Sequence, residues 1–253
     1  MTAQQPTFAT LTVVIPAYNE AKRIEAAIAA LDAAPPPAGL TRELIVVDDG
    51  SADGTRDILR RMAEGRTDLK LIEHERNSGK GAALRTGIRA ATGDIVVIHD
   101  ADLEYDPRDH AAALTPILEG RADAVIGSRF IGASHRVLYY WHYVANTVIT
   151  RYSNMLSNLN LTDIECCTKA FTREVVRHVE IEEPRFGVEP ELIAKLSRLR
   201  LPPENRRVRV YEVAVSYAGR TYAEGKKIGW KDGVRALWAI TKYSLGPHKA
   251  PNA

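Results

Sequence analysis

Short runs of β-branched residues alternate with helical patterns along the first half of the 253-residue chain, and this alternation constrains the fold most. Each run is apolar at nearly every position, so it predicts a strand that is buried on both faces. Between the runs, apolar residues recur at helical spacing, as at Ile24, Ile28 and Leu31. Buried strands joined by helices indicate a parallel sheet covered by helices on both faces. The predicted strands are 12–15, 44–47, 69–72, 95–98 and 124–126.

The second half of the chain carries two longer helical patterns with few charges. The first runs from Val137 to Ser157, and Arg151 is its only formally charged residue. The second covers Trp230 to Tyr243, and an alternating segment from Arg207 to Tyr217 predicts a strand or a hairpin arm. Such helices pack on the rest of the domain or lie at a membrane surface. The uncharged stretch 137–150 has 14 residues, fewer than the roughly 18 that a membrane-spanning helix needs.

Composition and charge narrow the function classes. The chain has 34 Lys and Arg against 32 Asp and Glu, a formal net charge of +2, which gives no reason to expect a nucleic-acid-binding protein. Its two cysteines, Cys166 and Cys167, are adjacent, so they support neither a disulfide framework nor, by themselves, a four-ligand zinc site. The first residues lack the basic start and apolar stretch of a signal peptide. We therefore expect a protein of a reducing, cytoplasmic compartment.

Acidic and small residues follow four of the predicted strands at the point where each strand ends. The carboxyl ends of parallel strands meet at one edge of a sheet, where ligands bind in such folds. A single cluster of Asp and Ser is explained by helix capping, but four clusters on one edge indicate a ligand site. The four segments are PAYNE at 16–20, DDGS at 48–51, NSGKG at 77–81 and DADLE at 100–104.

Asp100 and Asp102 form the most informative pair in these segments. Carboxylates at positions i and i+2 just after a strand both face one ion if the chain bends there, and a hard divalent cation held in this way completes its shell with substrate phosphates. Glu104 follows two residues later, within reach of the ion or its water. Neither a G-x-x-x-x-G-K-[ST] loop nor, after the first strand, a G-x-G-x-x-G loop is present, which argues against nucleoside triphosphate hydrolases and dinucleotide-dependent dehydrogenases.

Taken in order, these segments resemble those of the glycosyltransferase family 2 proteins, which have the GT-A fold. GSRF at 127–130 extends the match. The likeness continues towards the polyprenyl-phosphate (dolichol-phosphate) sugar synthases through Thr162–Phe171 and through Arg220 followed by Lys226, so it covers roughly residues 10–230. The resemblance implies an α/β GT-A fold, Rossmann-like, with a mostly parallel sheet and helices on both faces, plus C-terminal amphipathic, interfacial helices.

The resemblance also implies a division of the chain and roles for individual residues. The implied segments are an N-terminal extension (1–9), a nucleotide-sugar-binding GT-A half (10–130), an acceptor-binding half with amphipathic helices and a basic loop (131–245) and a tail (246–253).

The implied donor-binding residues are Pro16, Tyr18, Glu20, Val47, Asp48, Asp49, Lys80, Asp100, Ala101 and Lys226. Mg²⁺ or Mn²⁺ would be held by Asp100, Asp102 and Glu104, and the implied catalytic residues are Asp102, Arg129 and Arg220. The implied acceptor-binding residues are Arg129, His142, Asn146 and Lys169. His142 and Asn146 stand where the relatives have an Arg and a Ser, and Cys167 stands where they have Gly.

The implied reaction moves a sugar from a GDP- or UDP-sugar to an acceptor, with inversion at the sugar carbon. A polyprenyl phosphate acceptor is already anionic and needs only alignment, whereas a hydroxyl acceptor needs a carboxylate base. Candidates for that base are Asp102, Glu104, Asp163 and Glu189. We expect the lipid phosphate acceptor, used by a peripheral protein on the cytoplasmic face of the membrane.

Three alternatives stay open at the level of sequence. The first is a transferase of the same fold that acts on a soluble or protein-bound hydroxyl. The second is a non-catalytic nucleotide-sugar-binding subunit of a membrane complex, against which the intact Asp100 and Asp102 argue. The third is a sugar nucleotidyltransferase, whose Gly-rich, Arg-containing loop after the first strand is absent here. The apolar helices would contact a bilayer, a membrane partner subunit or a second copy of the chain.

Overall fold

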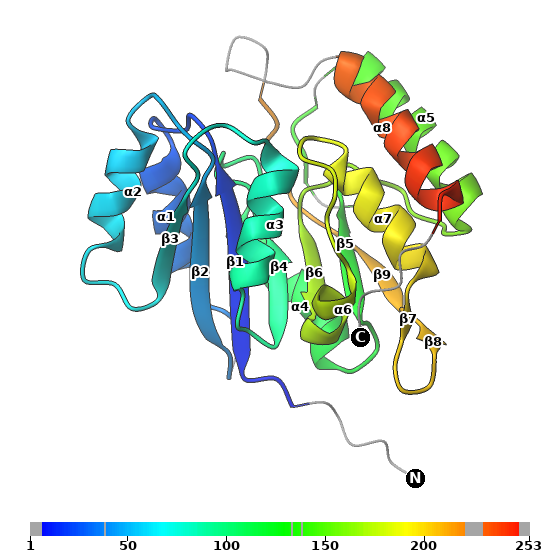
Figure 1. Cartoon of the computed structure of the whole chain (residues 1–253), viewed down its shortest axis with the longest axis horizontal. Coiled ribbons are helices and arrows are strands. Elements are labelled where there is room, and N and C mark those ends of the chain that lie inside the picture. The colour runs from blue at the N-terminus through cyan, green and yellow to red at the C-terminus, as the bar shows by residue number, and fades with distance from the viewer. Residues whose placement is uncertain (1–6, 38, 133, 138, 221–229, 248–253) are drawn as a thin grey trace.

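The computed structural model describes residues 7–37, 39–132, 134–137, 139–220 and 230–247, and strands and helices alternate along its first half (Figure 1). The strands are β1 Thr10–Ala17, β2 Thr41–Asp48, β3 Leu69–Glu73, β4 Ile95–Ile98, β5 Ala124–Ser128, β6 Lys169–Thr172, β7 Arg200–Leu201, β8 Arg206–Arg207 and β9 Val210–Ala214. The helices are α1 Ile24–Ala33, α2 Thr55–Ala63, α3 Lys80–Ala90, α4 His110–Leu118, α5 Tyr140–Ser157, α6 Arg173–His178, α7 Val188–Arg198 and α8 Trp230–Leu245, with a 3₁₀ turn η1 at Pro107–Asp109.

One seven-stranded sheet, in the order β3-β2-β1-β4-β6-β5-β9, organises the described part of the chain. β1 pairs in parallel with β2 and β4, whereas β6 runs antiparallel to both of its neighbours, β4 and β5. The carboxyl ends of β1, β2, β4 and β5 therefore share one edge of the sheet. Because β6 is reversed, its first residue, Lys169, lies opposite Ile98 at this same edge.

The strands are buried on both faces because their residues alternate between two apolar layers. Val13 and Ile15 of β1 pack in the layer that contains residues of α1, α2 and α4, whereas Val14 packs in the layer of α3 and α7. Every residue of β4 is buried, as expected for a central strand with helices on both sides. The sheet is thus a rigid support for the loops that follow its strands.

α5 and α8 lie side by side beyond α7, at the end of the molecule away from α1 and α2 (Figure 1). The hydroxyls of Tyr152 on α5 and Thr241 on α8 are 2.8 Å apart, which joins the two helices. Large apolar side chains on both helices face solvent, among them Trp141 (75% exposed) and Val234 (58% exposed). Within the described ranges, no helix has both the length and the apolarity required to cross a membrane.

The predicted fold class is confirmed by this architecture. The five predicted strands correspond to β1–β5, and both long helical patterns form helices. The alternating segment 207–217 contains β9, which extends the sheet beyond β5, while β7 and β8 form a separate short hairpin. The sequence did not predict β6 as a strand, because its four residues were taken only as part of a motif.

Candidate functional site

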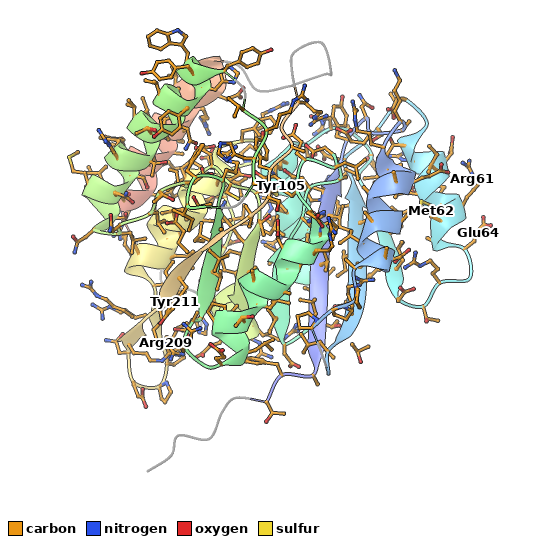
Figure 2. The ribbon with its side chains drawn as sticks, turned by 180° about the vertical axis from the view of Figure 1, so that it is seen from behind. Arg61, Met62, Glu64, Tyr105, Arg209 and Tyr211 are labelled. Atoms are coloured by element: carbon orange, nitrogen blue, oxygen red, sulfur yellow. The ribbon has the colours of Figure 1, made fainter. Side chains whose placement is uncertain are left out.

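A cavity of about 1470 Å³ opens where β1, β2 and β4 end, and it extends to the walls formed by α5 and α8. Tyr105, which follows β4 and is labelled in Figure 2, also lines it. The cavity brings together most of the side chains that the sequence predicts for the site. Those that line it are Pro16, Tyr18, Glu20, Asp49, Lys80, Asp100, Ala101, Asp102, Glu104, Arg129, His142, Asn146 and Arg220.

Asp49, directly after β2, fixes the loop that leads into α3. Its carboxylate accepts hydrogen bonds from the backbone N–H groups of Ser78 (3.0 Å) and Gly79 (2.7 Å) and from the side-chain amide of Asn77 (3.0 Å). The Nδ1 atom of His74 lies 2.7 Å from the same carboxylate. Asp49 therefore has two roles: it lines the cavity, and it holds in place the loop before α3 that forms one of the cavity walls.

The turn before α3 packs closely against a distant segment of the chain. Gly79 has a φ of +99°, and a Cβ atom there would press into the carbonyl oxygen of Pro184. The same carbonyl accepts a hydrogen bond from the backbone N–H of Ala82 (3.0 Å). Only glycine satisfies both constraints, and the contact brings Arg185 and Phe186 into the cavity lining.

Two of the predicted donor-binding residues do not line the cavity. Val47 is fully buried in the apolar layer of the sheet. Asp48 is also fully buried, and its Oδ2 atom forms an ion pair with Nε of Arg56 at 2.9 Å. The structure therefore assigns to Asp48 the anchoring of α2 to the end of β2.

Lys80 joins the β4 rim to α7 at the centre of the cavity. Its ammonium lies 2.9 Å from Oδ2 of Asp100 and 2.8 Å from Oε1 of Glu189. Burial alone would lower the pKa of Lys80, but the carboxylates, Asp100 foremost, hold it well above its usual value. Burial likewise opposes ionisation of Asp100, and Lys80 outweighs that effect and lowers the Asp100 pKa. Both groups are therefore charged at neutral pH.

Asp102 and Glu104 converge on Arg220. The guanidinium donates through Nη2 to Oδ2 of Asp102 and through Nε to Oε1 of Glu104, both at 2.6 Å. Between the two acidic residues, Leu103 has a φ of +63°, a left-handed conformation that is costly for this side chain. Tyr217 donates its hydroxyl hydrogen to Oε2 of Glu104 at 2.9 Å. Burial, then the proximity of Asp100 and Glu104, raises the pKa of Asp102 to about 7.

These three carboxylates fit a divalent cation chemically, although they are not arranged around one centre. Among the described residues, no three acidic, His or Cys side chains are arranged to hold an ion. Asp100 turns to Lys80, while Asp102 and Glu104 turn to Arg220. Burial first, and the charges of Asp100 and Glu104 second, raise the pKa of Asp102, and a bound cation would offset both effects.

Arg129, at the end of β5, is held by a buried carboxylate. Its Nε and Nη2 atoms lie 2.6 Å and 2.9 Å from the two oxygens of Asp163, which is fully buried. Asn146 on α5 joins this pair, with its Oδ1 atom 3.3 Å from Nη2 of Arg129. His142, one turn earlier on α5, lines the same part of the cavity and packs its ring on Tyr139.

Two further predicted residues are not part of the described cavity. Lys169 is fully buried at the start of β6, and its ammonium donates to the backbone carbonyls of Ile164 and Cys166. It stabilises the loop before β6, although the sequence predicts an acceptor-binding role for it. Lys226 lies outside the described residues.

Sequence reasoning missed several residues that shape the site. Tyr217 was taken only as the end of an alternating segment, and its contact with Glu104 depends on β9 pairing beside β5. Glu165 was not singled out, yet it lines the cavity together with Glu189. A Glu beside two cysteines carries no recognisable signal, so its place became visible only with the fold.

Comparisons with known proteins agree with this picture. Residues 12–180 match the family model described as "Glycosyl transferase family 2". Among curated proteins, the chain is 27% identical over 218 residues to an undecaprenyl-phosphate 4-deoxy-4-formamido-L-arabinose transferase of Aeromonas hydrophila, covering 85% of this chain and 62% of that protein. It is 28% identical over 221 residues to a dodecaprenyl-phosphate galacturonate synthase of Rhizobium johnstonii, covering 85% and 61%. It is 27% identical over 225 residues to a dolichol-phosphate mannosyltransferase of Pyrococcus furiosus, covering 87% and 59%.

Solved structures show the same fold. Glucosyl-3-phosphoglycerate synthase from Mycobacterium tuberculosis, in complex with Mn²⁺ and UDP-glucose, superimposes with a TM-score of 0.71 at 22% identity. That comparison covers 95% of this chain and 80% of the other. The chain spans less than two thirds of the length of the curated relatives cited above. The family match extends over most of the described sheet and its carboxylate rim, so this chain belongs to glycosyl transferase family 2.

Proposed function

We propose that this protein transfers a sugar from a nucleotide sugar to a polyprenyl phosphate, with inversion at the sugar carbon. One observation carries the proposal: a single cavity runs from the carboxylates after β4 to the partly exposed apolar helices α5 and α8. The first end suits a charged, hydrophilic donor, and the second suits a lipid chain. The curated relatives cited above act, by their names, on polyprenyl or dolichol phosphates.

The donor site is proposed to lie at the ends of β1, β2 and β4. Pro16, Tyr18, Glu20 and Asp49 line the part of the cavity where the nucleotide would bind. Asp100, Asp102 and Glu104 would hold Mg²⁺ or Mn²⁺, which supplies positive charge to the donor diphosphate as the bond to the sugar breaks. Lys80 and Arg220, already bonded to these carboxylates, are placed to balance the same developing charge.

The acceptor site is proposed to lie between Arg129 and α5. A phosphate is anionic at neutral pH, so its oxygen attacks without a strong general base and needs only alignment. Arg129 supplies a fixed cation for this purpose because Asp163 and Asn146 hold its guanidinium. His142, which is also on α5, lines the same wall of the cavity as Asn146. Val148 and Leu237, on α5 and α8, provide apolar surface beside the site.

The protein is proposed to act at the cytoplasmic face of a membrane, as a peripheral protein. α5 exposes Tyr140 (68%), Trp141 (75%) and Tyr143 (50%) near its first turn. Such aromatic residues are favoured at the boundary between water and lipid. Because Tyr140 and Tyr143 also line the cavity, a lipid phosphate would enter the site from the membrane surface.

Transfer of label to lipid tests the proposal. Purified protein would be incubated with polyprenyl phosphate, Mn²⁺ or Mg²⁺ and a panel of labelled GDP- and UDP-sugars, and the label extracted into organic solvent. We expect label from one donor, lost with a chelator and lost in Asp102→Asn. The control Asp106→Asn changes a neighbouring carboxylate that pairs with Arg108 outside this cavity, and it should retain transfer. Transfer to a soluble hydroxyl, with none to lipid phosphate, would contradict the proposed acceptor.

A further inference from the structure

One carboxyl group of the cavity has no role in the proposed donor and acceptor sites. Glu165 lies in the loop between α5 and β6 and lines the cavity. Its Oε1 atom is buried and has no hydrogen-bond partner among the described residues. A buried polar atom that no protein group satisfies is costly, so such an atom in a cavity commonly indicates a contact that a ligand supplies.

The backbone places Glu165 beside the proposed acceptor site. Asp163, two residues earlier, is fully buried, and its Oδ1 atom accepts three hydrogen bonds. The donors are Nη2 of Arg129 (2.9 Å), Nδ2 of Asn146 (3.3 Å) and the backbone N–H of Glu165 (3.2 Å). One carboxylate oxygen therefore joins Glu165 to Arg129, the cation that is proposed to align the acceptor phosphate.

Burial and the neighbouring charges keep the side chain of Glu165 neutral at pH 7. Burial first, then Glu189 of α7, raises its pKa to about 8, and Asp163 in the same loop adds to the rise. Lys169 on β6 and Arg129 after β5 act in the opposite direction and are outweighed. At pH 7 Glu165 is therefore mainly a carboxylic acid, which donates a hydrogen bond as well as accepting one.

The neutral form suits an anionic ligand. A carboxylic acid offers its O–H group to an anionic oxygen, whereas a carboxylate would repel that oxygen. The charge of Arg129 is already offset by Asp163, whose oxygens lie 2.6 Å and 2.9 Å from the guanidinium. A phosphate beside Arg129 therefore gains from a further donor that brings no negative charge with it.

We propose that Glu165 binds the acceptor phosphate, donating a hydrogen bond from its carboxyl O–H group to an oxygen that does not attack the sugar. This inference rests on the proposed function and specifies how the acceptor is held. A phosphate monoester has three terminal oxygens, so Glu165 and Arg129 can hold two of them and leave the third to attack the sugar carbon. Because the hydrogen bond requires the acid form, acceptor binding weakens when Glu165 ionises.

Equilibrium binding of geranyl phosphate to the full chain tests the inference without relying on catalysis or on a metal ion. Geranyl phosphate is a short prenyl phosphate, and the second pKa of a phosphate monoester, about 6, leaves it mainly a dianion from about pH 7 to about pH 9.5. We expect its Kd to rise above pH 8, approaching about tenfold per pH unit, as the Glu165 proton is lost.

Variants assign the effect to the carboxyl O–H group. Glu165→Gln keeps a hydrogen-bond donor but cannot ionise, so at pH 7 it should bind within about threefold of the unchanged protein, and the rise above pH 8 should disappear. Glu165→Ala has no donor and should bind about tenfold more weakly at pH 7, the scale of a hydrogen bond to a charged group. If Glu165→Ala fails to fold, the pH profiles of the unchanged protein and Glu165→Gln decide alone. Glu174→Gln on α6, outside the cavity lining, is the matched control and should keep both the affinity and the pH profile.

The outcomes separate this inference from the proposed function. If the unchanged protein binds geranyl phosphate no more tightly than geraniol, it does not recognise the phosphate, and the proposed acceptor fails together with the inference. If the phosphate is recognised but Glu165→Ala binds it as tightly as the unchanged protein, only the inference fails. It also fails if Glu165→Gln binds as weakly as Glu165→Ala or retains the rise above pH 8, because shape or another titrating group would then be responsible.

Discussion

Arg220 neutralises two of the carboxylates that are proposed to hold the metal ion. Its guanidinium is 13% exposed and lies 2.6 Å from both Asp102 and Glu104. A cation that binds these oxygens in the absence of donor must compete with it. We therefore predict that Arg220→Gln binds Mn²⁺ about tenfold more tightly than the unchanged protein, the scale of the charged hydrogen bonds that are no longer displaced.

This prediction is checked by titrating Mn²⁺ and counting the free ion by electron paramagnetic resonance, without donor, at pH 8. That pH lies above the pKa of about 7 that Asp102 has in the unchanged protein, where the carboxylate is therefore mainly ionised. Arg108→Gln is the matched control, because Arg108 pairs with Asp106 and not with the three carboxylates. Weaker Mn²⁺ binding in Arg220→Gln would show instead that Arg220 organises the carboxylates for the ion.

Individual site residues differ in how far sequence could predict them. Asp100 and Asp102 were predictable because a carboxylate pair directly after a buried strand must lie at the ligand edge of a parallel sheet. Lys169 was misplaced because its motif gives a position along the chain, whereas its direction depends on β6 being antiparallel. Glu165 had no sequence signal at all, since the groups around it include Glu189 of α7 and Arg129 after β5, which lie far away in sequence.

At the scale of elements, the distance between a helix and the elements it packs against decides whether a helical glycine can be replaced by a larger residue. Gly87 on α3 lies so near β1 that an added Cβ would press into Cγ1 of Val14 and lie 3.3 Å from Cγ2 of Val47. At Gly233 on α8 the nearest atom would be Cδ1 of Ile149, at 3.8 Å, an ordinary contact. The two helical glycines should therefore respond oppositely to replacement by alanine.

We predict that Gly87→Ala lowers the free energy of unfolding by about 1–3 kcal/mol, the cost of overpacking a rigid core. Gly233→Ala should raise it by about 0.5–1 kcal/mol, because alanine loses less backbone entropy in a helix than glycine. Urea denaturation of both variants and the unchanged protein measures the two effects. A destabilised Gly233→Ala would mean that the start of α8 requires a glycine for reasons other than space.

A buried carboxylate fastens β9 to β5. Asp123, just before β5, is bound by the guanidinium groups of Arg206 (2.6 Å) and Arg209 (2.9 Å) and accepts the backbone N–H of Arg209 (2.8 Å). Burial opposes its ionisation, but these hydrogen bonds, those of Arg209 foremost, lower its pKa from 3.8 to about 2. The folded state therefore binds the Asp123 proton more weakly than the unfolded state does.

The pH dependence of stability follows from that difference. A lowered folded-state pKa contributes stability above the unfolded-state value, and the contribution is lost as the pH falls towards 2. We predict that Asp123→Asn costs about 2 kcal/mol of unfolding free energy at pH 7 and that this deficit shrinks between about pH 5 and pH 2. Urea unfolding at several pH values checks it, and a deficit independent of pH would show that packing, not charge, is lost.

The sequence predicted those strands whose own residue pattern is distinctive. It did not predict the short strands that form only because neighbouring strands pair with them. The five runs of β-branched residues gave β1–β5 because a run that is apolar on both faces has few alternatives to a central strand. β6 has only four residues, and it is a strand because β4 and β5 leave room for it between them. The hairpin β7–β8 is shorter still and carries no periodic signal.

At the scale of the whole molecule, the cavity connects two surfaces of different character. One is the rim of the sheet, with carboxylates, Lys80 and Arg220, and the other is the pair α5 and α8 at one end of the molecule (Figure 1). The sequence predicted both surfaces but not that they border one cavity, because that depends on α8 packing on α5 and α7. Their adjacency would give the proposed water-soluble donor and the proposed lipid acceptor separate approaches to the same reaction centre.

The exposed apolar side chains of α5 should therefore govern contact with a membrane more than the chemistry itself. Trp141 (75% exposed) and Met155 (68% exposed) lie on α5 but do not line the cavity. We predict that replacing both by serine lowers sedimentation with vesicles of neutral and anionic lipid about tenfold or more, because the protein then lacks the large apolar area that these side chains would bury in the lipid. Tyr211→Ser is the control, since Tyr211 is an exposed aromatic on β9, away from α5 (Figure 2).

The same variants separate membrane contact from catalysis. Transfer to long-chain polyprenyl phosphate in vesicles should fall with the double replacement, whereas transfer to a short, water-soluble prenyl phosphate should stay within about twofold, because the cavity lining is unchanged. If the double variant sediments like the unchanged protein, α5 does not carry the membrane contact. A second copy or a partner subunit would then cover this face, and a concentration-dependent change of mass that the double variant loses would identify the second copy.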